Sequence, residues 1–490
     1  MTSLKTSFNQ RKYWTNHRAS TVFPYFAQSI QSIVFQDYWI WKSNIEKKMV
    51  VITVRNCDGL VVYREVIEQI SNHNCHPIPS YLCDGGMIEF EIMTDENIKF
   101  PFPAIMMFVS SVDNKLVSCV HSGGRILNKN EEVARTTSVE SNFYCQLDSK
   151  FTPFFHIFNG NEPIQYNELN LSTCRVELCS GYDNTVLHSM VYKPPSLPYA
   201  SSVIKLNDLL EANNIHIDSD SSFYLRIHTL SCGIFPRLIC GNIHKESGFP
   251  FITHSFKSYD ENISDDFQET NSTDEISMFF PICCVSPLDL QIRSYPTNEP
   301  LIVRAKQELQ LTKTISEFTF LTGSKDASIQ IFESAGVNSI VRTYGRAPSR
   351  LNCSLNYSLP NSLHPTDIAT GFKCIDYPPK HSHWGHAILS NQFETLLFIR
   401  WIELPDNKSK VCEAQLSIDI FNEMESSEFR INILRDEITA IHLSDHFNIS
   451  SSSIQKSIVS WRFNTEIPTI ECFWVAYNAD TGAIAGEHGF

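Results

Sequence analysis

Hydrophobic and polar residues alternate in short runs along most of the chain, and turn-forming residues separate these runs. The clearest example spans residues 50–66, where VVITVRN and LVVYREV flank the dipeptide Asp58-Gly59. Alternation rich in β-branched residues predicts strands, and Asp-Gly between two such runs predicts a hairpin because both turn positions accept positive φ. The pattern therefore predicts an all-β fold of short antiparallel strands.

One strand–turn–strand pattern recurs three times, and each copy ends in a histidine. Pro103 and His121 are 18 residues apart, as are Pro236 and His254, and the third copy reaches His488. The copies lie at residues 102–125, 235–256 and 473–490. Self-similarity of this kind is typical of repeated structural units.

A longer correspondence joins residues 152–256 to residues 416–490. Both stretches carry strand patterns in the same order, and Arg226 and Arg462 precede the final hairpin at the same spacing. We therefore predict tandem immunoglobulin-like β-sandwich domains with an internal repeat, in three or four units.

The same patterns suggest a division of the chain into six segments. Residues 258–275 are acidic and almost free of apolar side chains, which is typical of a linker. The predicted segments are an N-terminal aromatic segment (1–48), sandwich repeat 1 (49–135), repeat 2 (136–257), the acidic linker (258–275), a β-rich domain with an irregular insertion (276–405) and repeat 3 (406–490).

Composition narrows the function classes. The 490 residues suffice for several cores, and the net charge of −15 argues against a nucleic-acid partner. Neither a membrane-spanning apolar run nor a secretory leader is visible, and the 15 cysteines form no C-x-x-C pair. We therefore expect reduced thiols, no transmembrane segment and a cytoplasmic location.

The densest group of candidate metal ligands is His381, His383 and His386, and Trp384 between them is a candidate ligand-binding residue. Imidazoles at this spacing can converge on one divalent metal when they lie on a loop after a strand. The pattern H-x-H-x-x-H resembles the signature of metallo-β-lactamase-type hydrolases, but Gly385 stands where that family has an aspartate. The alternative interpretation is a surface loop with three histidines and no metal.

The recurring histidines His121, His254 and His488 allow two interpretations. Each follows an apolar strand, so each could be a structural residue whose ring bonds a neighbouring carbonyl group. Alternatively, equivalent strand ends gather in one interface and present ligands. His364 and Asp367 form a further candidate ligand-binding pair in a polar loop.

Two functions follow from these patterns. The first is a non-catalytic multi-domain β-sandwich protein that recognises a carbohydrate or a protein partner, because repeats and aromatic residues are abundant and no strong catalytic motif is present. The second is a metal-dependent hydrolase or lyase that acts on a polar substrate through His381, His383 and His386. No cofactor is certain, and a divalent metal is the candidate.

Overall fold

The structure is a computed structural model, and it describes most of the chain. The described residues are 17–36, 48–94, 105–121, 126–127, 135–141, 145–159, 174–180, 185–193, 197–217, 223–232, 237–257, 267–269, 276–281, 285–294, 301–304, 315–319, 328–334, 338–344, 346–348, 350–374, 382–401, 413–422, 426–434, 438–447, 453–465 and 470–490.

The first unit is a sandwich of two antiparallel sheets. Their strand orders are β4-β3-β6-β1-β9 and β5-β2-β7-β8. The β3–β4 hairpin turns at Gly59, as the Asp-Gly pattern predicts, with φ of +85° at this glycine. The strands are β1 (His17–Tyr25), β2 (Ile30–Phe35), β3 (Lys48–Asn56), β4 (Val61–Ile67), β5 (Asn74–Ile78), β6 (Gly86–Thr94), β7 (Ile105–Ser110), β8 (Val117–His121) and β9 (Ile126–Leu127).

The second unit has the same strand order in both sheets. One sheet runs β13-β12-β15-β10-β18 and the other β14-β11-β16-β17. Its elements are β10 (Arg135–Ser141), β11 (Phe151–Phe158), β12 (Cys174–Ser180), β13 (Val186–Tyr192), β14 (Ser201–Lys205), α3 (Leu206–Ala212), β15 (Phe223–Cys232), β16 (Ile239–His244), β17 (Pro250–His254) and β18 (Phe256–Lys257).

The fourth unit repeats this order again, as β32-β31-β34-β29 and β33-β30-β35-β36. Arg226 on β15 and Arg462 on β34 therefore lie on corresponding strands, as do His254 and His488. Its elements are β29 (Ser382–Ile388), β30 (Glu394–Trp401), β31 (Glu413–Phe421), β32 (Ser426–Leu434), β33 (Ile438–His442), η2 (Leu443–Asp445), α4 (Ile454–Ser457), β34 (Ile458–Thr465), β35 (Ile470–Tyr477) and β36 (Ile484–His488).

The third unit differs from the other three. Its main strands form one continuous sheet, β22-β21-β27-β28-β20-β25-β24-β23, beside the short pair β19-β26. Its strands are β19 (Phe267–Glu269), β20 (Ile276–Pro281), β21 (Asp289–Ser294), β22 (Leu301–Arg304), β23 (Ile315–Thr319), β24 (Ser328–Ser334), β25 (Asn338–Tyr344), β26 (Arg346–Pro348), β27 (Arg350–Ser358) and β28 (Ile368–Cys374).

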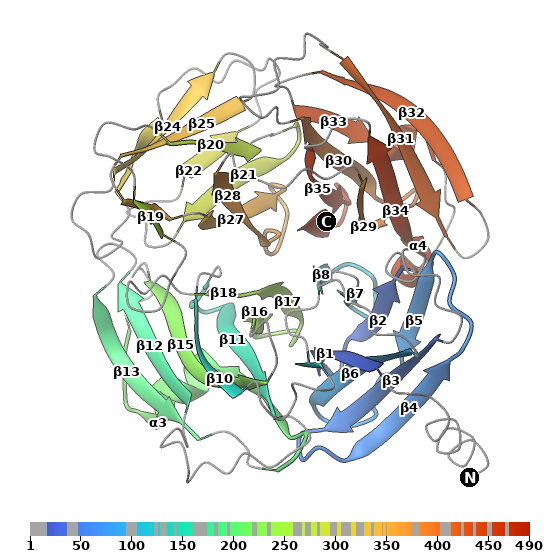
Figure 1. Ribbon diagram of the computed structural model, residues 1–490. Coiled ribbons are helices and arrows are strands. Elements are labelled where there is room, and N and C mark those ends of the chain that lie inside the picture. The colour runs from blue at the N-terminus through green and yellow to red at the C-terminus, as the bar shows by residue number, and fades with distance from the viewer. Residues whose placement is uncertain are drawn as a thin grey trace.

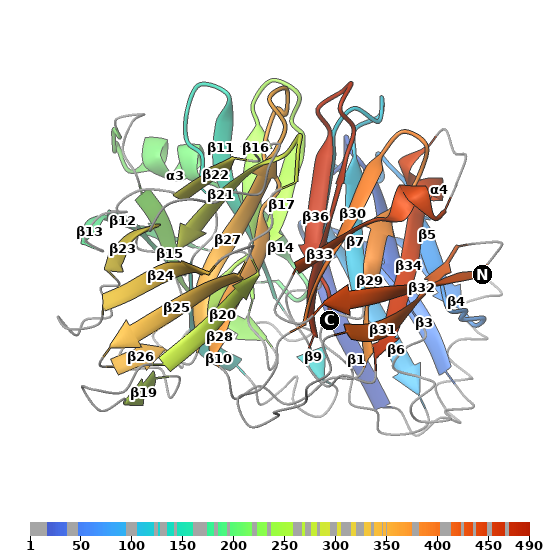
Figure 2. The ribbon, with the colours of Figure 1, turned by 90° about the horizontal axis from the view of Figure 1, so that it is seen from above.

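The four units surround a common axis (Figure 1), and in Figure 2 β17 and β36 run upright through the middle of the molecule. Contacts join each unit to the next around the axis. They are Ser201 N–H to the Cys57 carbonyl (3.0 Å), Thr253 Oγ1 to the Asp367 carbonyl (2.9 Å), the ring stack of Tyr357 on Phe473 (5.9 Å) and the stack of Phe108 on Trp474 (6.1 Å).

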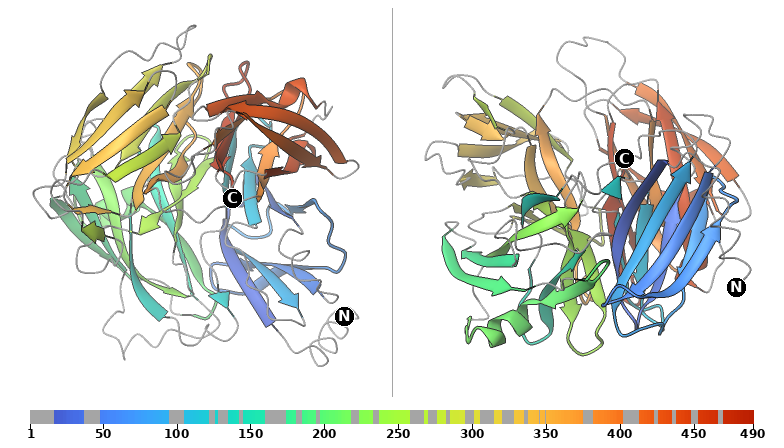
Figure 3. Two further views of the ribbon diagram at one scale, coloured as in Figure 1. Left: turned by 45° about the horizontal axis from the view of Figure 1, so that its top comes forward. Right: turned by 60° about the horizontal axis from the view of Figure 1, so that its bottom comes forward.

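The last of these contacts belongs to a continuous apolar core that closes the ring between the first and fourth units. Val34, Met106 and Phe108 of the first unit share this core with Trp461 and Trp474 of the fourth. Figure 3 shows these two units, blue and red, side by side. The ring is thus held by burial of apolar surface between segments that are far apart in the sequence.

The all-β sandwich class that the sequence predicts is confirmed, and every strand pairing in the described part of the chain is antiparallel. The immunoglobulin-like classification stays a prediction. No helix among the described residues is long and apolar enough to cross a membrane.

The sheets group the strands differently from the sequence-based division. β1 and β2, which fall in the predicted N-terminal segment, pair with β6 and β7 of the first unit. β29 and β30, which fall in the predicted third domain, pair with β34 and β35. The first two strands of a unit carry no turn signal that marks its start, so the sequence pattern alone does not assign them.

We expect Gly59→Ala to destabilise the junction of the first and second units. An added Cβ would lie 2.3 Å from the Pro198 carbonyl oxygen. Gly248→Ala is a matched control, because Gly248 also has positive φ but its nearest atom would be 3.6 Å away. Urea unfolding should show a loss of about 1 kcal/mol for Gly248→Ala and about 1–3 kcal/mol more for Gly59→Ala. Equal losses would show that this junction is not tightly packed.

Stability should fall when the pH drops from about 6.5 to 4. His73 is buried between the first and fourth units, with Nδ1 2.8 Å from Ser460 Oγ. Burial, with a smaller effect of His76, lowers its pKa to about 4. The unfolded state then binds more protons in this window, so His73 destabilises the acidified fold by about 3 kcal/mol.

Urea unfolding at several pH values checks this effect. His73→Asn, which keeps a polar atom near Ser460, should show a shallower loss of stability on acidification than the wild type. His446→Asn, a change at an exposed histidine, should leave the loss unchanged. An identical pH dependence in His73→Asn and the wild type would contradict the assignment.

Candidate metal centre

The three recurring histidines meet at the axis. His121 ends β8, His254 ends β17 and His488 ends β36, so the first, second and fourth units each supply one ring. The ring centroid of His121 lies 4.3 Å from that of His254 and 4.9 Å from that of His488. The three strand ends therefore gather in one interface, and a ligand role for their histidines stays a prediction.

A fourth candidate ligand, Glu487, lies beside His488. One ligand atom from each of His121, His254, Glu487 and His488 can be chosen so that all lie within 4.8 Å of one another. The sequence analysis missed Glu487. Its available signal was a lone carboxylate in the apolar strand that ends in His488.

Two separations within this cluster are close to those around a tetrahedral ion. The Nε2 atoms of His121 and His488 are 3.1 Å apart, and His488 Nε2 is 3.7 Å from Glu487 Oε1. A zinc ion with bonds of 2.0–2.1 Å to nitrogen places two ligand atoms about 3.3 Å apart. The two observed distances, 3.1 and 3.7 Å, lie on either side of that value.

Backbone carbonyl groups orient two of the rings. His254 Nδ1 lies 2.9 Å from the Ser255 carbonyl oxygen, and His488 Nδ1 lies 3.2 Å from that of Gly489. A carbonyl oxygen only accepts, so each Nδ1 carries the proton and each Nε2 keeps its lone pair. This arrangement, in which the second ring nitrogen donates to a carbonyl group, is common for histidines that bind metals.

Burial controls the charge of the cluster. Side chains of His121, His254 and Glu487 are nearly inaccessible, and that of His488 is 22% exposed. Burial, with the nearby His121 and Arg237, holds the pKa of His254 well below its ordinary value. Burial also raises the pKa of Glu487 to about 8, against the opposing effect of the N–H groups of His488 and His121 and with a further rise from Asp367. His254 is therefore a neutral donor that a divalent cation can use, whereas Glu487 would bind a cation after it loses its proton.

Close packing fixes the segment that follows the ligands. Phe490 exchanges two backbone hydrogen bonds with Trp384, at 3.0 and 3.1 Å, and its ring packs 4.6 Å from that of His488. A Cβ on Gly489 would lie 2.0 Å from Cys472 Sγ, so only glycine fits there. Trp384, a predicted ligand-binding residue, thus packs on this segment.

The third unit does not contribute a histidine. The sequence of β28, Ile368-Ala369-Thr370-Gly371-Phe372-Lys373, aligns with residues 252–257, which places Thr370 at the position of His254. β28 is also paired on both sides, with β27 and β20. β8, β17 and β36 instead end their sheets.

His383 and His386 do not converge. Both lie on β29 rather than on a loop. Residues three apart on a strand point to opposite faces, and the contacts agree. His383 stacks on Phe463 at 4.9 Å, whereas His386 Nδ1 lies 2.9 Å from Ser460 Oγ. His381 lies outside the described residues, so a metal site made of all three stays a prediction.

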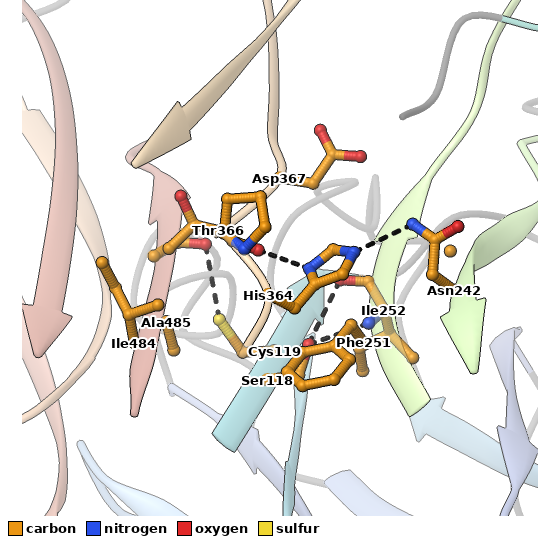
Figure 4. A pocket seen from close by; sticks show the side chains of 13 residues that line it. Ser118, Cys119, Asn242, Phe251, Ile252, His364, Thr366, Asp367, Ile484 and Ala485 are labelled. Carbon is orange, nitrogen blue, oxygen red and sulfur yellow. Dashed lines mark hydrogen bonds between the residues drawn. The ribbon is translucent and has the colours of Figure 1, made fainter. Parts of the chain in front are cut away.

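His364 and Asp367 lie near the axis, beside a small pocket (Figure 4). His364 Nδ1 lies 2.6 Å from the Pro365 carbonyl oxygen and Nε2 lies 3.0 Å from Asn242 Nδ2. Its ring also stacks on Phe251 at 4.5 Å. The pocket has a volume of about 10 Å³, which is room for one water molecule. These contacts link the second and third units; a ligand-binding role for the pair stays a prediction.

No protein-family model matches the chain, and no curated protein matches its sequence.

Proposed function

We propose that this protein is a non-catalytic β-sandwich protein that binds one divalent transition-metal ion at its axis. The observation that carries the proposal is the cluster of His121, His254, His488 and Glu487, drawn from three units. Imidazole-rich sites favour zinc, copper, nickel and cobalt over calcium and magnesium, which prefer oxygen ligands. Zinc suits this set best, because three nitrogen atoms and one carboxylate oxygen fill a tetrahedron.

The same ligand count supports a non-catalytic role. Catalytic zinc sites keep a coordination position for water or substrate, whereas structural sites are closed by four protein ligands. Four side chains are available here, and three of them are nearly inaccessible. The alternative from the sequence, a metal-dependent hydrolase or lyase, would need an open position.

For the partner, the described surface favours a protein over a glycan. Sugar recognition uses exposed aromatic rings, and Tyr81 is the one aromatic residue among the large hydrophobic side chains that are exposed in the described part of the chain. The others are aliphatic and lie mainly on or beside β4 and β13. They are Leu60, Val61, Val62, Val66, Val112, Val186, Leu187, Val191 and Leu197. A partner protein is therefore our proposal, and a glycan is the second candidate.

Elemental analysis of the purified protein tests the metal site. We expect about one zinc, cobalt or nickel ion per chain after loading and desalting. His254→Gln should lower the affinity by at least about 100-fold, more than the 10–100-fold typical for loss of a hydrogen-bond partner of a ligand. His383→Gln is the matched control at a second buried histidine and should retain the metal.

Two results would count against this assignment. Protein that stays metal-free after loading would remove the metal site. Retention of the metal in His254→Gln with its loss in His383→Gln would move the site to the segment around His381 and favour the enzyme alternative.

A further inference from the structure

The strands that carry the ligands share one position. β8, β17 and β36 each lie at one end of their sheet, so in the described part of the chain each has one edge without a backbone-paired neighbour. No strand pairing in the described part of the chain joins these three strands to one another. An edge strand leaves a row of backbone N–H and C=O groups that need partners when they are buried.

Side chains from the neighbouring edge strand satisfy some of these groups. Ser118 Oγ on β8 accepts a 2.8 Å hydrogen bond from Ile252 N–H on β17. Cys119 Sγ, also on β8, lies 3.5 Å from the Gly486 carbonyl oxygen on β36. Glu487 Oε2 lies 3.4 Å from the backbone nitrogen of His121. Isolated side-chain contacts, rather than a backbone ladder, therefore connect the three strands.

The metal ligands lie at the end of this same junction. A metal bound there would connect all three strands at one point, with His121 from β8, His254 from β17, and Glu487 with His488 from β36. In the third unit, β28 is paired on both sides and carries Thr370 at the corresponding position. The three histidines are thus found on strands that end their sheets in the described part of the chain.

We infer that metal occupancy controls whether the three edge strands at the axis stay closed. This inference rests on the proposed metal site and adds what the bound metal does to the three strands. An ion that binds only the closed arrangement lowers the population of the open one by a factor of one plus the ratio of the free metal concentration to Kd. At a free metal concentration of about 100 times Kd the suppression is about 100-fold.

Opening should stay local to the axis. The first and fourth units share an apolar core around Phe108 and Trp474. These two residues lie on β7 and β35, which are paired on both sides. Each unit also keeps its own buried strands, such as β3, whose interior positions are all buried. Removal of the metal is therefore expected to loosen β8, β17 and β36 and to leave the cores of the units folded.

Hydrogen exchange with mass spectrometry on the full chain tests this. The zinc-loaded protein is compared with protein treated with excess EDTA and with EDTA-treated protein to which zinc is returned. Peptides that cover β8, β17 and β36 should exchange about 10–100-fold faster without zinc. Peptides that cover β3 should not change, and returned zinc should restore slow exchange.

Two variants separate the metal from the other contacts. Glu487→Gln keeps the shape and an acceptor oxygen but weakens the metal site, so its edge strands should exchange fast even with zinc present. Ser118→Ala removes the link to Ile252 and keeps all four ligands. It should loosen β17 yet still respond to zinc by at least about 10-fold. If Glu487→Gln does not fold, the comparison of wild-type protein with and without zinc decides alone.

The outcomes distinguish this inference from the proposed function. Stoichiometric metal binding with equal exchange rates in the presence and absence of zinc would overturn the inference and leave the metal site standing. Faster exchange throughout all units on chelation would also overturn it, because the metal would then support the whole fold. Protein that takes up no metal would overturn both.

Discussion

Three strands meet at the axis of this protein, and in the described part of the chain one edge of each is left without backbone pairing to another strand. A buried backbone N–H or C=O group without a partner is costly, so this edge must be satisfied by side chains, water or an ion. This requirement explains which residue types occupy the junction. Ser118 and Cys119 are small and polar and reach across to neighbouring backbone groups, and Gly486 has no room for a Cβ because Trp474 and Ile368 lie against it.

The same constraint explains the charges at the axis. Desolvation disfavours ionised groups, which is why the pKa of His254 is lowered and that of Glu487 is raised. Neutral imidazole is the form that binds metal, and a carboxyl group that binds a cation releases its proton to solvent, so that the cation compensates its negative charge. The burial that keeps His254 neutral thus also keeps its lone pair available to a divalent ion.

The sequence predicts the units better than it predicts their arrangement. Alternation and Asp-Gly turn chemistry identify β3, β4 and the final hairpins, because these signals are local. The equal spacing of Pro103 to His121 and Pro236 to His254 places the histidines on corresponding strands. It does not show that these strands meet, since that depends on the apolar core that joins Phe108 to Trp474 across 366 residues of sequence. His383 and His386 illustrate the opposite case. They are close in sequence, but both lie on strand β29, where residues three apart point to opposite faces.

The departure of the third unit from the common strand order bears on the donors of the proposed metal site. Four equivalent histidines around an axis of four units would lie close to one plane and favour a square-planar ion such as copper or nickel. In the third unit β28 is paired on both sides, and the corresponding residue is Thr370. Glu487 on β36 then supplies the fourth donor from the same strand as His488, and its Oε2 lies against the backbone of β8. Three imidazole nitrogens and one carboxylate oxygen are a donor set that zinc takes in tetrahedral sites, so the absence of a fourth histidine agrees with the proposed zinc site.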